Sequence, residues 1–359
     1  MGQHIIKLFL LSFILLVNIN CKKDQSTESK TKSLKLETPE STEKHFAIVI
    51  HGGAGTIKKA NMTPEQEKVY REKLQEALNV GYAVLEKGGA SLEAVQKTVN
   101  VLEDSPLFNA GKGAVFNSVG KNELDASIMD GKTLNSGAVA GVSRIKNPIN
   151  AARIVMDSTR HVLLSGKGAE DFAKQHGLIF VDDKYFHTEK RYNQLLKAQE
   201  KDKVQLDHTA YKTNEPIDDH KYGTVGAVAL DKNGNIAAAT STGGMTNKKY
   251  GRIGDSPIIG AGTYANNKTC GVSCTGTGEY FIRTLAAHEA SNLMQYKNLS
   301  LQESFKNVIG QVGDLGGDGG MVGLDKDANI AWYFNTDGMY RGYKKSNGEN
   351  VVHFYEKQN

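Results

Sequence analysis

Apolar positions recur along this chain of 359 residues with two different spacings, and each spacing predicts one kind of element. Residues 46–50 form an unbroken apolar run, which is typical of a buried strand. Residues 63–66 are Thr-Pro-Glu-Gln, which predicts a capped helix start because the threonine and glutamine side chains satisfy free backbone amides. Apolar side chains then keep to one face over 74–85 and again over 92–102. These two helices are predicted to cover one face of a sheet.

The second half of the chain contains two similar hairpin patterns. The first joins strands over 225–230 and 236–240 through an Asp-Lys-Asn-Gly-Asn turn, and a similar layout recurs over 320–332. Together with the elements around them, these hairpins predict stacked antiparallel sheets flanked by helices, an α+β fold with four layers in the order α-β-β-α. The surrounding elements are strands over 123–131 and 136–142 and helices over 151–158, 169–176, 279–293 and 301–312.

The first 44 residues differ from the rest of the chain. An apolar run over 8–17 is too short to cross a bilayer but suits the core of a signal peptide, which is predicted over 1–20. Cys21 resembles the lipidation site of a bacterial lipoprotein, although Asn20 departs from the usual small residues before such a cysteine. Residues 21–44 are polar and lack aromatic side chains, which predicts a solvated tether. We expect an exported protein, in the bacterial periplasm or on the outer membrane, with a lipid anchor as its link to the membrane.

The composition is that of a folded protein. With 39% hydrophobic and 23% charged residues, the chain can bury a sizeable core as one large domain or two. Its 38 glycines and 6 prolines favour many tight turns rather than disorder. The net charge of +4 is spread over mixed signs, so we expect no nucleic-acid partner. Residues 182–223 are polar, rich in lysine and weakly periodic, which predicts a mobile surface linker.

The end of this polar segment and the start of the next strand meet at Gly223-Thr224. A threonine hydroxyl is inert at neutral pH unless a base takes its proton, and a free α-amine, with a pKa of roughly 8, can act as that base. Thr224 gains this amine only if the bond after Gly223 is cut. Glycine suits the cut because, without a Cβ atom, its carbonyl can be approached closely. The alternative is that Gly-Thr simply begins a strand, and only the rest of the sequence distinguishes the two.

Six segments resemble, in the same order, the plant-type asparaginase and isoaspartyl peptidase family of N-terminal-nucleophile hydrolases. They are 51–55 (HGGAG), 106–111 (PLFNAG), 240–248 (TSTGGMTNK), 251–257 (GRIGDSP), 260–265 (GAGTYA) and 274–279 (CTGTGE). Several unusual segments are a far more specific signal than one short motif. The resemblance covers about 45–343 and implies the same four-layer fold.

The resemblance also implies an activity and a processing step. The chain would cut itself into an α subunit, 45–223, and a β subunit, 224–359, and two such cleaved units would form a dimer. The β subunit would then hydrolyse the side-chain amide of asparagine and the isopeptide bond of β-aspartyl dipeptides through a threonyl acyl-enzyme. Its substrates would be small molecules or dipeptides, and catalysis would need no cofactor.

The expected catalytic residues surround Thr224. Thr242 ends the strand that returns beside Thr224, so its hydroxyl is predicted to hydrogen-bond the nucleophile. Thr275 and Gly276 are predicted to present a hydroxyl and an amide from a glycine-rich turn to the developing oxyanion, worth about 3 kcal/mol per donor. Asn109 is predicted to hold the Thr224 amine or to polarise a carbonyl. For each of these residues, an ordinary structural role is the alternative.

The expected substrate-binding residues lie in one later loop. Arg252 and Asp255 supply a cation and an anion, which together complement the carboxylate and ammonium of an amino-acid head group. We expect Arg252 to bind the carboxylate and Asp255 to bind the ammonium, with help from the Gly278 carbonyl. Taken alone, an Arg-x-x-Asp loop is more often a surface salt bridge.

The resemblance further implies a sodium ion held by main-chain oxygens in the loop after the second helix. The expected ligands are the carbonyls of Leu102, Glu103, Ser105, Phe108, Ala110 and Lys112. Cys270 and Cys274 lie four apart in a predicted strand and so face the same side. We expect them in the core, with a disulfide as an alternative in an oxidising compartment. Residues 314–320 lack the spaced acids of a calcium loop and predict a glycine-rich turn near the active site.

Three functions compete at this point. The first is the self-cleaving asparaginase and isoaspartyl peptidase. The second is a glycosylasparaginase, a related exported hydrolase that acts on the linkage between a sugar and asparagine. The third is a lipoprotein that has kept the fold for binding without cleavage. The combination of Thr224, Thr242 and Thr275 with Arg252 and Asp255 favours an enzyme.

Overall fold

The computed structural model describes residues 45–207 and 223–355. The predicted signal peptide, the tether and Cys21 lie outside the described residues, and so does the part of the predicted linker over 208–222. Within the described part, no helix combines the length and apolar character needed to cross a membrane.

The elements follow the order that the sequence predicts. The helices are α1 (Pro64–Glu86), α2 (Ser91–Glu103), α3 (Pro148–Ser158), α4 (Gly166–Gln175), α5 (Glu189–Asp207), α6 (Gly278–Thr284), α7 (Ala286–Lys297) and α8 (Leu301–Asp314), with 3-10 turns η1 (Lys59–Asn61), η2 (Gly111–Gly113) and η3 (Asp183–Tyr185). The strands are β1 (Ala47–Gly55), β2 (Leu124–Asp130), β3 (Ser136–Val142), β4 (Leu163–Ser165), β5 (Val225–Leu230), β6 (Ile236–Thr242), β7 (Thr263–Ala265), β8 (Cys270–Gly276), β9 (Gly319–Asp325), β10 (Ile330–Phe334), β11 (Gly338–Lys345) and β12 (Asn350–His353).

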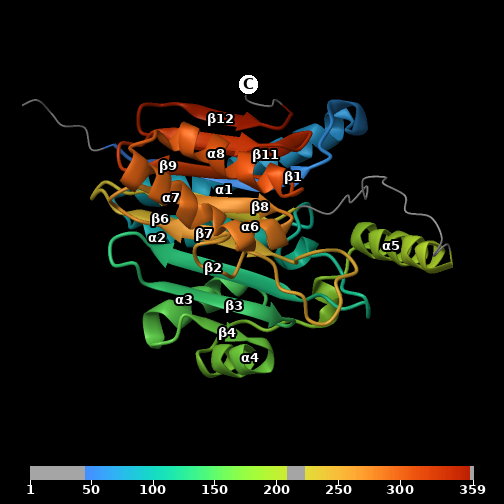
Figure 1. Ribbon diagram of the computed structural model, residues 1–359. Helices are drawn as coiled ribbons and strands as arrows, with labels where there is room; N and C mark the ends of the chain where they lie inside the picture. Colours follow the sequence, from blue (N-terminus) through green and yellow to red (C-terminus); the bar gives the residue numbers. More distant parts are fainter. Residues whose placement is uncertain (1–44, 208–222, 356–359) are drawn as a thin grey trace, which may run out of the picture. The chain divides into compact units, whose positions relative to one another are not determined.

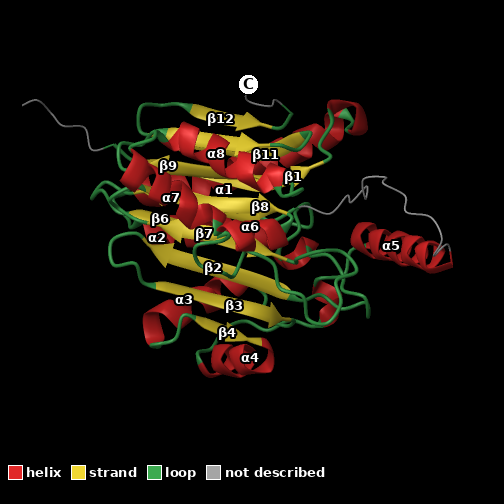
Figure 2. Ribbon diagram, in the orientation of Figure 1, coloured by secondary structure: helices red, strands yellow, loops and turns green. Residues whose placement is uncertain are grey.

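Two stacked sheets form the centre of the fold. The larger sheet has the order β12-β11-β1-β5-β6-β2-β3-β4, and the smaller has the order β10-β9-β8-β7 (Figure 1). Apolar side chains of β1, β5 and β6 pack against those of β9 between the sheets. A second cluster lies under α1, α2 and α3, and a third lies between the smaller sheet and α6, α7 and α8 (Figure 2). The predicted four layers, α-β-β-α, are therefore confirmed.

The helix starts also follow the sequence. Thr63 caps α1, where its side chain accepts from the Gln66 amide while the Gln66 side chain accepts from the Thr63 amide. The helix predicted over 279–293 is broken at Leu285, which has a φ of 47° and separates α6 from α7. A leucine in this left-handed conformation has no signature in the apolar pattern, because its side chain is exposed at the break.

Residues 189–207 of the predicted linker form a helix, α5, which the weak periodicity did not predict. This helix is weakly amphipathic, because most of its side chains are polar or exposed and only Arg191 and Leu195 are buried among 189–202. The Arg191 guanidinium donates from Nε to the carbonyl of Gly113 at 2.8 Å. A buried polar contact rather than an apolar stripe therefore anchors the helix, and the apolar pattern could not reveal it.

The two cysteines of β8 are free thiols in the core beneath α6, α7 and α8. Cys270 lies opposite Asp325 and Cys274 lies opposite Met321 in the ladder with β9. Four residues along a strand span about 13 Å, which is well beyond the Cα separation that a disulfide bridges. The core position is confirmed and the alternative of a disulfide between them is wrong.

Candidate active site

The predicted nucleophile lies at the start of a central strand. Thr224 is buried immediately before β5, and its Oγ1 donates to Oγ1 of Thr242 at 3.1 Å. The two residues are neighbours because β5 pairs with β6 in a register that places Val225 opposite Ser241. The Thr242 hydroxyl also accepts from the amide of Gly244 at 3.0 Å. The structure thus brings the two threonines together as the sequence predicts.

A small cavity of about 20 Å³ adjoins Thr224. It is lined by Gly223, Thr224, Thr242, Gly244, Met245, Arg252, Gly254, Asp255, Ser256 and Gly276. This volume accommodates about one water molecule, so an amino acid does not fit beside the uncut Gly223-Thr224 bond. Because Gly223 is itself part of the wall, its departure enlarges the cavity.

Arg252 and Asp255 meet in this cavity. The Arg252 guanidinium donates to both carboxylate oxygens of Glu279 at 2.8 Å each, so a second acid from α6 holds it in place. Burial raises the pKa of Asp255 to about 7, and the charge of Arg252 only partly opposes this shift. One buried oxygen of Asp255, Oδ2, has no hydrogen-bond partner among the described residues. A buried carboxylate oxygen without a partner is suited to a ligand that carries an ammonium.

Glycine is required where Gly278 approaches this pair. A Cβ atom at that position would lie 2.8 Å from Oδ1 of Asp255 and 3.0 Å from Nη2 of Arg252. The predicted proximity of Gly278 to the head-group residues is therefore present in the structure. Sequence reasoning missed the partner of the arginine, Glu279, although that residue directly follows Gly278 in the sixth motif.

Thr275 and Gly276 end strand β8 rather than forming the predicted glycine-rich turn. The turn lies across from them: a Cβ atom on Gly276 would overlap the Asp318 carbonyl, and the Thr277 amide donates to that carbonyl at 2.9 Å. The Thr275 hydroxyl is buried and has no partner among the described residues, so it is available to a ligand. The expected glycine-rich turn over 314–320 thus lies beside Gly276 and Thr277, at the start of the neighbouring strand β9.

Asn109 is engaged by backbone groups in the uncut chain. Its side-chain Nδ2 donates to the Gly244 carbonyl at 2.7 Å, and its Oδ1 accepts from the Val115 amide at 2.9 Å. Both ends of the amide are thus engaged by backbone, and the residue joins its own loop to the turn after Thr242. Asn109 also adjoins the scissile bond, because a Cβ atom on Gly223 would lie 2.8 Å from Cβ of Asn109. Its contact with the Thr224 amine, which exists only after cleavage, stays a prediction.

Three buried groups behind the site escaped sequence reasoning. Lys248 is buried, and its ammonium donates to the Glu123 carbonyl at 2.9 Å. Asp125 lies opposite Thr242 in the β2–β6 ladder, and burial raises the pKa of its carboxyl. His51 contacts Ser273 through Nε2 at 2.8 Å, and burial lowers the pKa of its imidazole to about 3, so it is neutral. The sequence signal that could have indicated these groups is a charged or polar residue inside a predicted strand or motif.

The loop between α2 and η2 is tightly folded. A Cβ atom on Gly111 would overlap the Glu103 carbonyl, and one on Gly113 would overlap the Phe108 carbonyl, so only glycine fits at either position. The Glu103 carboxylate is also buried and accepts from the hydroxyl of Ser241 at 2.7 Å. Burial raises the pKa of Glu103 to about 7. Among the described residues, no cluster of three His, Cys, Asp or Glu side chains forms a metal site.

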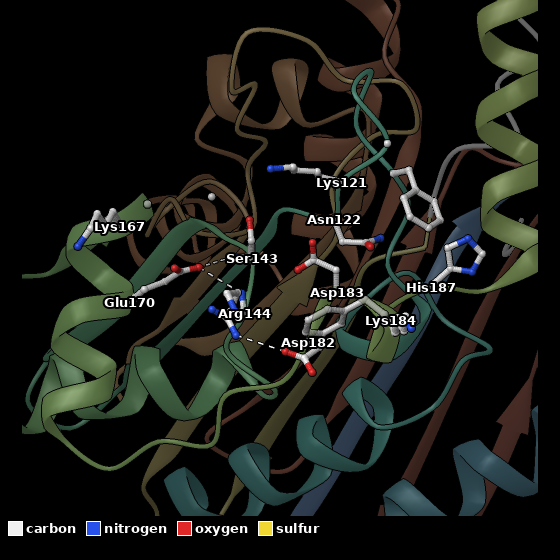
Figure 3. Close-up of a pocket in the computed structure, with 15 residues that line it drawn as sticks. Lys121, Asn122, Ser143, Arg144, Lys167, Glu170, Asp182, Asp183, Lys184 and His187 are labelled. Carbon is white, nitrogen blue, oxygen red and sulfur yellow. Dashed lines mark hydrogen bonds and ion pairs between the residues drawn. The ribbon is translucent and has the colours of Figure 1, made fainter.

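A larger cavity, of about 810 Å³, contains none of the predicted site residues. Figure 3 shows its charged side chains, which come from the loop before β2, from the residues after β3, from the first half of α4 and from the residues around η3. Arg144 pairs with Asp182 at 3.4 Å, and Glu170 accepts from the amides of Ser143 and Arg144. These groups largely satisfy one another. The candidate chemistry therefore lies at Thr224 and not in the larger cavity.

Comparison with known proteins agrees with this geometry. A family model described as asparaginase matches residues 44–354. The chain belongs to this asparaginase family. Its stacked sheets and flanking helices are accordingly the N-terminal-nucleophile hydrolase fold, and the protein is a hydrolase.

Relatives in the asparaginase family come from distant organisms. The isoaspartyl peptidase of Escherichia coli is 52% identical over 298 residues, which cover 82% of this chain and 92% of the relative. The plant-type L-asparaginase of Pyrococcus horikoshii is 43% identical over 310 residues, covering 84% and 97%. The isoaspartyl peptidase/L-asparaginase of Xenopus laevis is 40% identical over 292 residues, covering 81% and 90%.

Proposed function

We propose that this protein cuts itself between Gly223 and Thr224 and then hydrolyses L-asparagine and β-aspartyl dipeptides. The observation that carries the proposal is the contact between Thr224 and Thr242 in the wall of a cavity that also holds Arg252 and Asp255. A nucleophile and an amino-acid head-group site in one cavity fit a substrate with a reactive side-chain carbonyl. The names of the relatives from Escherichia coli and Xenopus laevis support the same two substrates.

Each of the site residues has one role in the proposed reaction. The free α-amine of Thr224 takes the hydroxyl proton, and Oγ1 attacks the side-chain carbonyl of the bound aspartyl group. The Thr275 hydroxyl and the Gly276 amide stabilise the negative oxygen that develops. Ammonia or an amino acid leaves with a proton, and water then hydrolyses the threonyl ester. Arg252 and Asp255 hold the carboxylate and ammonium of the substrate throughout.

Intact-mass and N-terminal sequence analysis of the purified chain tests the first step. Two fragments, one beginning at Thr224, are expected after incubation at neutral pH. Rates with asparagine, β-aspartyl-leucine and a glycosylated asparagine then test the substrate, and the first two are expected to be turned over. A correctly folded chain that stays whole would instead favour a binding protein, and turnover of the glycosylated asparagine alone would favour a glycosylasparaginase.

We also propose a structural sodium ion in the loop between α2 and η2. Its ligands would be the main-chain carbonyls of Leu102, Glu103, Ser105, Phe108, Ala110 and Lys112. The close approach of the Glu103 carbonyl to Gly111 and of the Phe108 carbonyl to Gly113 supports this site, because it shows a loop folded tightly around its main-chain oxygens. The ion would hold the loop that carries Asn109, and catalysis would use no cofactor. Removal of alkali cations is expected to lower thermal stability, and added sodium is expected to restore it.

We further propose an exported protein that functions as a dimer of cleaved units. The apolar run over 8–17 and Cys21 support a signal peptide and a lipid anchor, in the periplasm or on the outer membrane. Metabolic labelling with a radioactive fatty acid tests the anchor, because a Cys21→Ala variant is expected to lose the label. Light scattering of the cleaved protein tests the dimer.

A further inference from the structure

A second cavity shares Gly223 with the candidate active site. Its volume is about 160 Å³, enough for a carboxylate and several waters at about 30 Å³ per water. Beside Gly223, its wall includes Asn109, Tyr70, Tyr340, Lys190 and Arg191. The scissile glycine is therefore part of the wall of two cavities, one next to the nucleophile and one next to two cations.

The cations of this second cavity lack an anion. Arg191 is buried, with Nε on the Gly113 carbonyl and Nη1 on the side chain of Gln194 at 3.1 Å. Among the side chains described in residues 45–202 and 223–355, no carboxylate lies within ion-pair distance of Arg191 or Lys190. Burial lowers the pKa of Arg191, but a guanidinium keeps its charge in proteins. A buried cation without a partner is unfavourable, so this cavity is suited to an anion.

The aromatic neighbours do not supply that negative charge. The Lys190 ammonium donates to the Tyr70 hydroxyl at 3.2 Å and lies 5.8 Å from the centre of the same ring. Tyr70 in turn donates to the Leu107 carbonyl, and burial raises the pKa of Tyr340 well above its usual range. Tyr340 thus supplies no negative charge, and the buried Arg191 guanidinium has no anionic partner among the residues that the structure describes.

Self-cleavage would create one anion in the wall of this cavity. The C–N bond between Gly223 and Thr224 breaks, the oxygen of a water bonds to the Gly223 carbonyl carbon, and the Thr224 nitrogen gains a proton. At neutral pH the products are a carboxylate on Gly223 and an amine on Thr224. Guanidinium and carboxylate form strong, charge-assisted hydrogen bonds.

We propose that the cavity with Arg191 and Lys190 receives the new carboxylate of Gly223 and holds this carboxylate away from Thr224. The inference rests on the proposed self-cleavage. It explains how a cavity of about 20 Å³ becomes a substrate pocket, because the residue that leaves was part of its wall. The carboxylate of an amino acid released from a β-aspartyl dipeptide has the same chemistry. Gly223 is a better occupant than this released amino acid, because it already lies in the wall of the cavity and because each cut chain supplies one Gly223 carboxylate.

The test uses the full-length Arg191→Gln variant after mass analysis shows complete cleavage. Without the guanidinium the Gly223 carboxylate is not held and competes with substrate, so KM for asparagine is expected to rise about tenfold while kcat stays within twofold, the size expected for one charged hydrogen bond. Trimming the α-half tail with a carboxypeptidase is expected to restore KM. Arg191→Lys is expected to stay close to the wild type, because it keeps the charge.

The matched control is Lys197→Gln, which removes an exposed cation from the same helix and is expected to change neither constant. If Arg191→Gln does not fold, Lys190→Gln tests the same cavity and leaves the hydrogen bond from Arg191 to Gly113 in place, with an expected rise in KM of about twofold to threefold.

An unchanged KM for asparagine in a folded, fully cleaved variant would overturn the proposal. A rise for β-aspartyl-leucine alone would also overturn it and assign the cavity to the leaving amino acid. A wild-type chain that neither cuts nor hydrolyses would instead disprove the proposed function.

Discussion

At the scale of single residues, the activity depends on how one hydroxyl is oriented. Thr242 accepts from both the Thr224 hydroxyl and the Gly244 amide, so the Thr224 hydroxyl donates rather than accepts in the uncut chain. This arrangement directs the free lone pairs of Thr224 Oγ1 away from Thr242. The lone pairs can therefore reach the carbonyl of a bound substrate.

Thr242→Val keeps the shape of the side chain but removes this acceptor. We expect kcat for asparagine to fall about tenfold with little change in KM, since one hydrogen bond contributes roughly 1.5 kcal/mol and acts on the nucleophile rather than on the head group. Steady-state kinetics of the cleaved variant measure both constants. A change in KM alone would contradict the assignment.

Asp255 predicts a dependence of substrate binding on pH. The pKa of its carboxyl is raised to about 7, so the charged form that binds an ammonium appears as the pH rises through about 7. KM for asparagine is therefore expected to fall between pH 6 and 8. By contrast, kcat follows the Thr224 amine and is expected to fall as the pH drops below that amine's pKa of roughly 8. An Asp255→Asn variant is expected to have a high KM that no longer depends on pH. A wild-type KM and kcat that are both flat over this range would refute both assignments.

The sequence revealed the candidate nucleophile, Thr242 and the Arg252–Asp255 pair because these residues sit in unusual local motifs. It could not reveal Glu279 as the partner of Arg252 or Lys248 behind the Gly244 turn, because each contact depends on how separate loops pack. Asn109 was placed near the site correctly, but its hydrogen bonds to Val115 and Gly244 follow from loop geometry that no periodicity encodes.

At the scale of elements, predictions succeeded where local chemistry sets the boundary. The capped start of α1 and the hairpin of β5 and β6 depend on neighbouring residues alone, and both were predicted. The break at Leu285 and helix α5 depend on tertiary contacts, and both were missed. Sheet order was also beyond the sequence, because it depends on which distant strands pair.

Helix α8 offers a stability test away from the candidate site. Ser300 accepts from the Glu303 amide, and the Glu303 side chain accepts from the Ser300 amide. Ser300→Ala is expected to lower the free energy of unfolding by about 1 kcal/mol because the first turn loses this cap. Urea unfolding in an uncut Thr224→Ala background measures the change, with Lys306→Ala on the exposed face as a control expected to stay within about 0.5 kcal/mol. Equal effects of the two variants would argue against the cap.

At the scale of the whole molecule, the two halves on either side of Gly223-Thr224 interleave. Strand β1 of the first half lies between β11 and β5 of the second, and β2 of the first half pairs with β6 of the second. These three ladders and the core between the sheets do not depend on the peptide bond after Gly223.

We therefore expect the cleaved fragments to remain together. Gel filtration under native conditions is expected to give one peak at the same elution volume for the cut protein and for uncut Thr224→Ala. Fragments are expected to separate only in denaturant. Two native peaks after cleavage would show that the shared ladders are too weak to hold the halves.

Because the strands of the two halves interleave, the protein folds easily only while both halves belong to one chain. Before the cut, both halves are tethered, so each meets its partner at a high effective concentration. After the cut, unfolding would release two separate chains, and restoring the sheet would require a bimolecular encounter between aggregation-prone strands. The mature protein would then stay folded because it unfolds slowly, and not because unfolding is reversible. Its lifetime would be set by the rate of unfolding of the structure that the precursor formed.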